Sequence, residues 1–263
     1  MHWATENGHQ VVADILIKAG SNQDAKDKNR NFAVKGVWTP LHSACSRVDQ
    51  AEVDALIKAG AKLEAKDVER KTPLHIACSK RNQTIVDALI KAGAKTGAKD
   101  GLTRTPLHIA SECGHQAVVD TLIESGANKE AKEFQSNNPL CYASEYGHQA
   151  VVDSLIKAGA NMNALEFGGR NPVRIAIVKG HQAVADSLIK AGASTEGALH
   201  EASDYGRHTI VDSLLKAGAK KDELKSGITS LQSATEKGHQ AVVDILNNTE
   251  AVEVSMNCQC TVM

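Results

Sequence analysis

The sequence predicts an all-α solenoid of paired antiparallel helices joined by hairpin-like connectors. Three observations predict it: a 33-residue period, short helical segments with apolar ridges inside each period, and an interior that contains few rings. Aromatic residues make up only 3% of the chain, so Ala, Val, Leu and Ile must fill the core. Equivalent positions of the period fall at Met1, Leu41, Leu74, Leu107, Leu140, Val173, Leu199 and Leu231, with 33 residues between Leu41 and Leu74 and at each step up to Val173.

One period shows how each element arises. Thr105 predicts a helix N-cap, and the proline after it suits the first helical position, so a first helix should run to about Cys113. A second helix over Gln116–Ser125 carries two apolar ridges, and Gly126 predicts a left-handed C-cap. The polar stretch 127–137 then predicts an extended connector. Helices this short are marginal alone in water, so neighbouring repeats must bury each other's ridges.

The repeated motifs are specific as well as regular. Thr72–Ala77 and Thr105–Ala110 both read Thr-Pro-Leu-His-Ile-Ala, and Gly-His pairs mark the turn inside several repeats. With these motifs, residues 1–247 resemble the ankyrin-repeat family, in about eight repeats. The resemblance implies a non-catalytic module that binds another protein on its concave face. It also implies that the histidines of both motifs are structural hydrogen-bonding groups that tie repeats together.

The pattern departs from the period in three places. Met1 stands where a leucine should follow Thr-Pro, so we expect a truncated first repeat; the alternative is an unusually bare N-terminal cap. The connector over Lys26–Trp38 carries seven extra residues and predicts a longer polar finger. Seven residues are missing before Leu199, where Ser194–Gly197 replaces the connector, so repeat seven should lack most of its hairpin and leave a notch. Residues 248–263 have no helical period and predict a flexible tail.

The sequence offers no clustered chemistry. Cys45 and Cys78 share one helix position beside the interior alanine and predict small core residues, whereas Cys141 replaces a motif histidine. We expect no enzyme activity, no cofactor, no bound metal and no small-molecule substrate, because no catalytic or metal-ligand spacing appears. A net charge of −1 does not favour nucleic acid. We expect a cytoplasmic monomer with reduced thiols.

The variable positions of the repeat predict where a partner binds. Four of the six Phe and Tyr residues fall on them, and exposed aromatics are typical binding anchors. The alternative is that these rings cover the neighbouring hairpin. We expect repeats four to seven to carry the main contact. The candidate positions on the first helices are Arg47, Lys80, Cys113, Tyr146, Lys179, Tyr205 and Lys237, and those on the connector tips are Val68, Leu102, Phe134 and Phe167.

The last four residues, Cys260–Met263, fit a C-a-a-X prenylation box, and the terminal methionine favours farnesyl on Cys260. One lipid gives only marginal membrane binding, and Cys258 offers a second site, for palmitoylation. An alternative interpretation is that residues 261–263 form a C-terminal ligand for a PDZ domain.

These features together predict a non-catalytic adaptor that lipid attachment holds at the cytosolic side of a membrane. The alternative is a protein without a lipid anchor: a soluble scaffold, a substrate-recognition subunit such as a ubiquitin-ligase adaptor, or a bacterial effector acting in a eukaryotic host.

Overall fold

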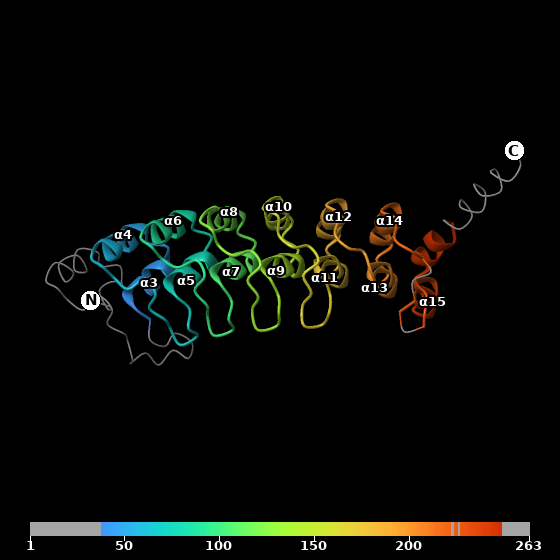
Figure 1. Cartoon of the computed structure of the whole chain (residues 1–263), viewed down its shortest axis with the longest axis horizontal. Helices are drawn as coiled ribbons and strands as arrows, with labels where there is room; N and C mark the ends of the chain where they lie inside the picture. Colours follow the sequence, from blue (N-terminus) through green and yellow to red (C-terminus); the bar gives the residue numbers. More distant parts are fainter. Residues whose placement is uncertain (1–37, 222–223, 226, 249–263) are drawn as a thin grey trace, which may run out of the picture. The chain divides into compact units, whose positions relative to one another are not determined.

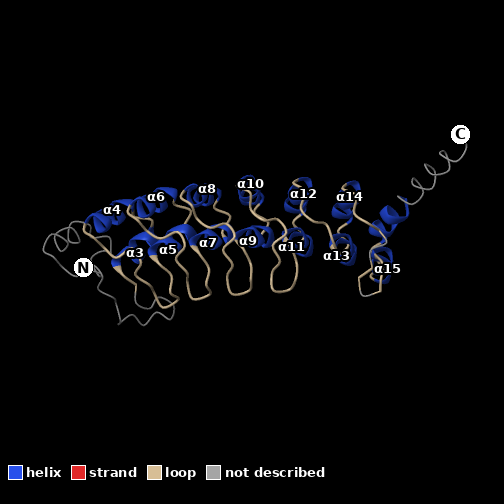
Figure 2. Ribbon diagram, in the orientation of Figure 1, coloured by secondary structure: helices blue, strands red, loops and turns tan. Residues whose placement is uncertain are grey.

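The computed structural model describes residues 38–221, 224–225 and 227–248. Within these ranges the chain is helical, and its one β pairing is an isolated antiparallel bridge between Lys225 and Ile228 (Figure 2). This confirms the predicted all-α class. The truncated first repeat, most of the Lys26–Trp38 connector and the tail beyond 248 lie outside the described residues. The chain groups into two compact units, Met1–Pro139 and Leu140–Met263, called unit 1 and unit 2 below.

Unit 1 repeats a pair of short helices. The first helices of the pairs contact one another in one row, the second helices contact one another in another, and the connectors project beyond the first helices (Figure 1). The six helices described in this unit are α3 (Pro40–Arg47), α4 (Gln50–Lys58), α5 (Pro73–Ser79), α6 (Gln83–Lys91), α7 (Pro106–Glu112) and α8 (Gln116–Glu124).

Unit 2 repeats the same pair of helices. Helix α9 begins at Pro139, one residue before the start of this unit at Leu140. The first helices α11, α13 and α15 of unit 2 contact in sequence, as do its second helices α10, α12 and α14. The last described helix covers residues 240–248, one residue past the expected boundary of the repeats. The labelled helices are α9 (Pro139–Glu145), α10 (Gln149–Lys157), α11 (Pro172–Lys179), α12 (Gln182–Lys190), α13 (Ala198–Asp204), α14 (His208–Lys216) and α15 (Ser230–Glu236).

A histidine at the third helical position joins each of the described first helices of unit 1 to the next connector. The Thr105 N–H donates to Nδ1 of His108 at 3.1 Å, and Nε2 of His108 donates to the Asn137 carbonyl at 3.1 Å. His42 makes the same two bonds, with the Thr39 N–H and the Lys71 carbonyl. His75 makes them with the Thr72 N–H and the Arg104 carbonyl. The structural role that the family resemblance implied is confirmed for these three histidines.

The second histidine motif links the second helix of one repeat to the first helix of the preceding repeat. In unit 1, Nδ1 of His115 donates to the Cys78 carbonyl at 2.9 Å. In unit 2, Nε2 of His181 donates to the Glu145 carbonyl at 2.9 Å, and His239 bonds the Asp204 carbonyl in the same way. Carbonyls at a helix C-terminus lack partners within the helix, so these bonds satisfy groups that would otherwise be orphaned.

The core of each unit is aliphatic, as predicted. Leu41, Leu74 and Leu107 are at most 1% exposed, and burying a leucine fully contributes roughly 1.5–3 kcal/mol. Cys45 and Cys78 are buried, as predicted for core residues. The buried position of Cys141 shows that a small side chain replaces the motif histidine there without exposing the site.

Candidate partner-binding surface

A buried carboxylate builds the tip of each hairpin described in unit 1. Oδ1 of Asp100 accepts hydrogen bonds from the N–H groups of Leu102 (2.9 Å) and Arg104 (2.8 Å). Thr103 between them takes a positive φ of 62°, which closes the turn. Asp67 and Glu133 hold the equivalent N–H groups of their own connectors. The tips are therefore fixed by local hydrogen bonds and do not depend on a partner for their shape.

Neighbouring hairpins of unit 1 are bonded to each other through their backbones. The Gly101 N–H donates to the Glu69 carbonyl at 2.7 Å, and the Phe134 N–H donates to the Leu102 carbonyl at 3.3 Å. A Cβ at Gly101 would lie 2.9 Å from the Glu69 oxygen, so this close approach requires glycine. The connectors form a continuous ledge that presents their tip side chains at a fixed spacing.

The tip side chains predicted from the sequence are exposed and apolar. In unit 1, Val68 and Leu102 are more than half exposed and Phe134 is 76% exposed. In unit 2, Phe167 is 89% exposed. Such exposure leaves little of either phenylalanine against its own chain, which disfavours the interpretation that these rings cover a neighbouring hairpin. Their role in binding a partner stays a prediction.

The first-helix ends of unit 2 carry a second aromatic group. Tyr146 stacks between Tyr142 and His148, with ring centroids 6.5 and 6.3 Å apart and nearly parallel planes. Lys179 lies beside this stack and pairs with Glu145 at 2.8 Å, and that hydrogen bond raises the pKa of the Lys179 ammonium. Stacking fixes the Tyr146 ring while leaving it 47% exposed. A partner would therefore meet an ordered ring with little conformational entropy left to lose.

The remaining predicted positions are exposed but chemically varied. Arg47 pairs with the buried carboxylate of Glu52, and Lys237 pairs with Asp204 at 3.0 Å. Tyr205, Lys80 and Cys113 each lie at the C-cap of a first helix. Within each unit the structure brings the predicted residues onto connector tips and first-helix ends.

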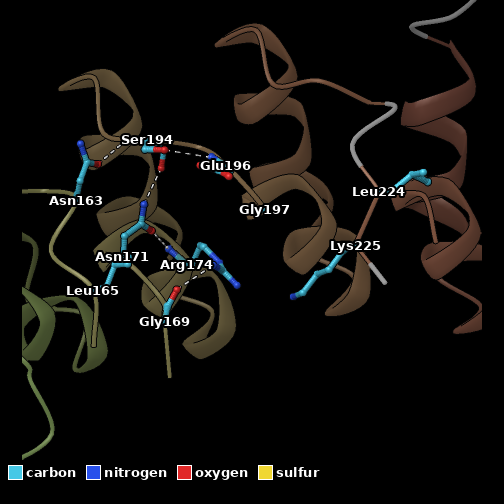
Figure 3. Close-up of a pocket in the computed structure, with 10 residues that line it drawn as sticks. All are labelled: Asn163, Leu165, Gly169, Asn171, Arg174, Ser194, Glu196, Gly197, Leu224 and Lys225. Atoms are coloured by element: carbon cyan, nitrogen blue, oxygen red, sulfur yellow. Dashed lines mark hydrogen bonds between the residues drawn. The ribbon is translucent and has the colours of Figure 1, made fainter. Parts of the chain in front are cut away.

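Sequence reasoning missed a cleft in unit 2. Its volume is about 580 Å³, and it lies where the short connector 191–197 stands in place of a full hairpin (Figure 3). The missing seven residues indicated a notch, but the period alone did not identify its lining. Arg174, Lys225 and the exposed side chains of Leu165 and Leu224 line it. The signal for Arg174 was its place in the motif histidine slot.

Burial shifts the pKa of several titratable groups of the described residues. Burial raises the pKa of the Cys45 and Cys78 thiols, so both stay protonated. Burial also lowers the pKa of His108 to about 4 and keeps the ring neutral. In the described ranges, no three His, Cys, Asp or Glu side chains are grouped to hold a metal ion. Every helix of that part of the chain is too short or too polar to cross a bilayer.

Stacked helix pairs with a ledge of fixed, exposed connector tips define a repeat protein of the protein-binding class. The family model for ankyrin repeats, in three copies, matches residues 1–100, 53–133 and 129–197. The chain therefore belongs to the ankyrin-repeat family and is a protein–protein interaction module. No curated protein matches the chain. The predicted lipidation sites, Cys258 and Cys260, lie outside the described residues.

Proposed function

We propose that this chain is a non-catalytic adaptor that binds another protein through the exposed rings of its connector tips and first-helix ends. The proposal rests on one observation: these aromatic side chains are exposed to solvent and are held in fixed positions by the connectors or by ring stacking. Phe167 is 89% exposed on a hairpin, and Tyr146 is held by ring stacking. Exposure of a large apolar side chain to water is unfavourable, so a partner that buries it fully gains roughly 1.5–3 kcal/mol.

The test uses the full chain as bait in a eukaryotic cell extract, with captured proteins measured by quantitative mass spectrometry. The variant carries Tyr146→Ala together with Phe167→Ala, both in unit 2. Proteins captured by the wild type should be depleted at least tenfold on this variant, because two anchor rings together supply more than about 1.4 kcal/mol.

The matched control carries Lys157→Ala together with Lys190→Ala, at the exposed ends of the second helices α10 and α12. It changes two exposed side chains of the same unit on the other row of helices. Retention of the captured proteins on the control and their loss on the aromatic variant supports the proposal. Equal capture by the wild type and both variants would show that the aromatic rings are not part of the binding surface.

We also propose that lipid on Cys260, a farnesyl group, holds the adaptor at the cytosolic side of a membrane, with palmitoyl on Cys258 as the second anchor. The support is the C-a-a-X pattern of residues 260–263 and the thiol two residues before it. Membrane attachment would raise the local concentration of the bound partner at that surface.

Fractionation of eukaryotic cells tests the anchor. Cys260→Ser should move the protein from the membrane fraction to the soluble fraction, and Cys258→Ser should reduce its membrane share. Cys113→Ser is the matched control, since Cys113 is an exposed thiol within the repeats. Equal partitioning of Cys260→Ser and wild type would leave a soluble scaffold as the function.

A further inference from the structure

The described hairpins of unit 1 carry a local excess of positive charge. Residues 61–71, 94–104 and 127–137 contain nine lysines and arginines against six aspartates and glutamates, although the whole chain has a net charge of −1. Three of the six acids are the buried tip carboxylates, which accept hydrogen bonds from N–H groups of their own connectors. The corresponding connector of unit 2, residues 160–170, contains one acid and one base. The excess therefore belongs to the ledge of unit 1.

One lysine of each hairpin comes directly before the buried tip acid. These tip lysines are Lys66, Lys99 and Lys132, at intervals of 33 residues. The Lys66 ammonium donates to the Lys99 carbonyl at 3.0 Å, so the lysine of one hairpin reaches the backbone of the next. Within the described ranges no carboxylate pairs with any of the three ammonium groups. The nearby Glu64 carboxylate accepts the Lys95 N–H at 2.8 Å and holds two hairpins together. The tip lysines are therefore cations without a counterion in their own chain.

An exposed apolar side chain follows each tip lysine within three residues. These apolar tips are Val68, Leu102 and Phe134, and each is more than half exposed. They lie in the turns that end the hairpins, and the connectors of unit 1 project beyond its first helices (Figure 1). Backbone hydrogen bonds between the hairpins fix the tips relative to one another. The ledge is therefore amphipathic across its width, with apolar groups at its outer edge and ammonium groups just behind them.

An anionic lipid bilayer matches both features of this edge. Apolar side chains enter the boundary between headgroups and acyl chains, while lysine side chains extend their ammonium groups to the anionic headgroups. Each basic residue near such a surface strengthens binding roughly fivefold. An acidic protein segment would match the charge, but it would meet three tips that project at separate points. A bilayer surface reaches all three tips at once, so the projecting edge favours lipid over a peptide.

We propose that the ledge of unit 1 docks on an anionic membrane surface, with the apolar tips at the headgroup boundary and the tip lysines bound to lipid headgroups. The inference rests on the proposed membrane attachment and leaves the rings of unit 2 to the protein partner. A single prenyl chain binds membranes only marginally, and a polybasic patch is one of the signals that make such binding stable. No lysine or arginine follows Lys237 in the sequence. Folding instead assembles the patch from three hairpins that are 33 residues apart.

The experiment measures cosedimentation of the full chain with lipid vesicles, using protein made in bacteria so that it carries no prenyl or palmitoyl group. The wild type should bind vesicles of phosphatidylcholine and phosphatidylserine in a three-to-one ratio, bind pure phosphatidylcholine much more weakly, and lose binding as salt is added. Lys99→Glu together with Lys132→Glu should lower the partition coefficient at least about tenfold, because two basic contacts are replaced by repulsion. The matched control, Lys157→Glu with Lys190→Glu, has the same net charge and reverses two exposed lysines of unit 2. It should bind as the wild type does.

A second variant tests the apolar tips without changing charge. Leu102→Ser together with Phe134→Ser should weaken binding to the mixed vesicles by about fivefold or more, because the apolar area that enters the bilayer is lost. Its circular dichroism spectrum should match the wild type, since both side chains are exposed.

Three results would overturn the proposal: equal binding to the two kinds of vesicle, equal binding by the lysine variant and its control, or unchanged binding by the serine variant. Fluorescence anisotropy with a labelled glutamate-rich peptide covers the other class of partner. If this peptide binds the wild type but not the lysine variant, while vesicles do not bind, the ledge recognises an acidic protein segment and the proposal is wrong. None of these results depends on lipidation or on the rings of unit 2. Failure of this surface is therefore distinguishable from failure of the proposed function, which the cell fractionation and capture experiments test.

Discussion

Units 1 and 2 use the same helix pair but join first helices to connectors in different ways. In unit 1 the slot after each anchor leucine holds His42, His75 and His108, and each buried imidazole bonds a threonine N–H and a carbonyl of the next connector. In unit 2 the same slot holds Cys141, Arg174, His200 and Gln232. Arg174 replaces the neutral bond with an ion pair to Glu201, and Gln232 accepts only from the Thr229 N–H of its own helix at 2.9 Å.

The difference shows where this repeat architecture leaves room for a binding site. A buried neutral ladder fixes helix, connector and tip together, and the three described connectors of unit 1 are bonded into one ledge. In unit 2 a charged side chain, Arg174, takes the slot, and it is 20% exposed, so the connection there reaches the surface. The cleft of unit 2 lies beside Arg174, where the ladder has been replaced and a hairpin is missing.

The largest expected effect comes from removing one member of the ladder. His108→Ala should lower the free energy of unfolding by roughly 4 kcal/mol, because it leaves the buried Thr105 N–H and Asn137 carbonyl unpaired and opens a small cavity. Gln232→Ala changes the same slot in unit 2 and should cost only about 1 kcal/mol, because it removes one exposed helix cap.

Urea titration followed by far-ultraviolet circular dichroism measures both variants on the full chain. Hydrogen exchange resolved by peptide then assigns the lost protection to unit 1 or unit 2. Equal losses for the two variants would contradict the distinction drawn between a buried ladder and a local cap.

The second prediction concerns pH and separates the two units. The pKa of His108 lies at about 4 in the folded chain against 6.5 for an exposed histidine, and that of His75 is also lowered, in both cases chiefly by burial. The unfolded chain therefore binds more protons between these values. Stability from His108 should fall by up to about 3 kcal/mol as the pH drops from 6.5 to 4. The lowered pKa of Glu201 in unit 2 gives stability that is lost only below its usual value of 4.5.

Hydrogen exchange at pH 7 and pH 5, corrected for the intrinsic exchange rate, tests this order of loss. Unit 1 should lose protection first, whereas the region around Glu201 should keep it. In His108→Gln, a variant that does not titrate, the part of the loss that comes from His108 should disappear. Protection that falls equally in both units between pH 7 and pH 5 would show that the ladder is not the acid-sensitive element.

The helix pairs were predictable because their signals are local. The sequence marks the start of a helix pair with Thr105 and the proline after it, and its end with Gly126. In the structure, α7 and α8 begin and end within one residue of the expected bounds. The exposure of Phe134 and Phe167 also followed from comparing repeats within the chain. These features depend on residues that are close together in the sequence, and the 33-residue period shows which positions are equivalent.

The cleft was only half predictable, because its lining comes from three connectors. The missing residues before Leu199 indicated a gap, but the convergence of Arg174 and Lys225 on Glu201 depends on how α11, α13 and the connector after α14 pack. Lys225 lies in a stretch where no motif fixes the register of the chain. Contacts of this kind follow from tertiary packing and leave no periodic signal in the sequence.

The smallest expected effect compares two connector glycines, Gly101 in unit 1 and Gly168 in unit 2. Gly101→Ala should cost roughly 2 kcal/mol, because the new Cβ would lie 2.9 Å from the Glu69 carbonyl oxygen and the two hairpin backbones would have to separate. Gly168→Ala should cost less than about 0.5 kcal/mol, since its Cβ would meet only the flexible end of Glu166. Urea titration of the two variants gives the difference directly. A loss at Gly168 as large as that at Gly101 would contradict this difference, because the only atoms that a Cβ at Gly168 meets are those of the Glu166 side chain.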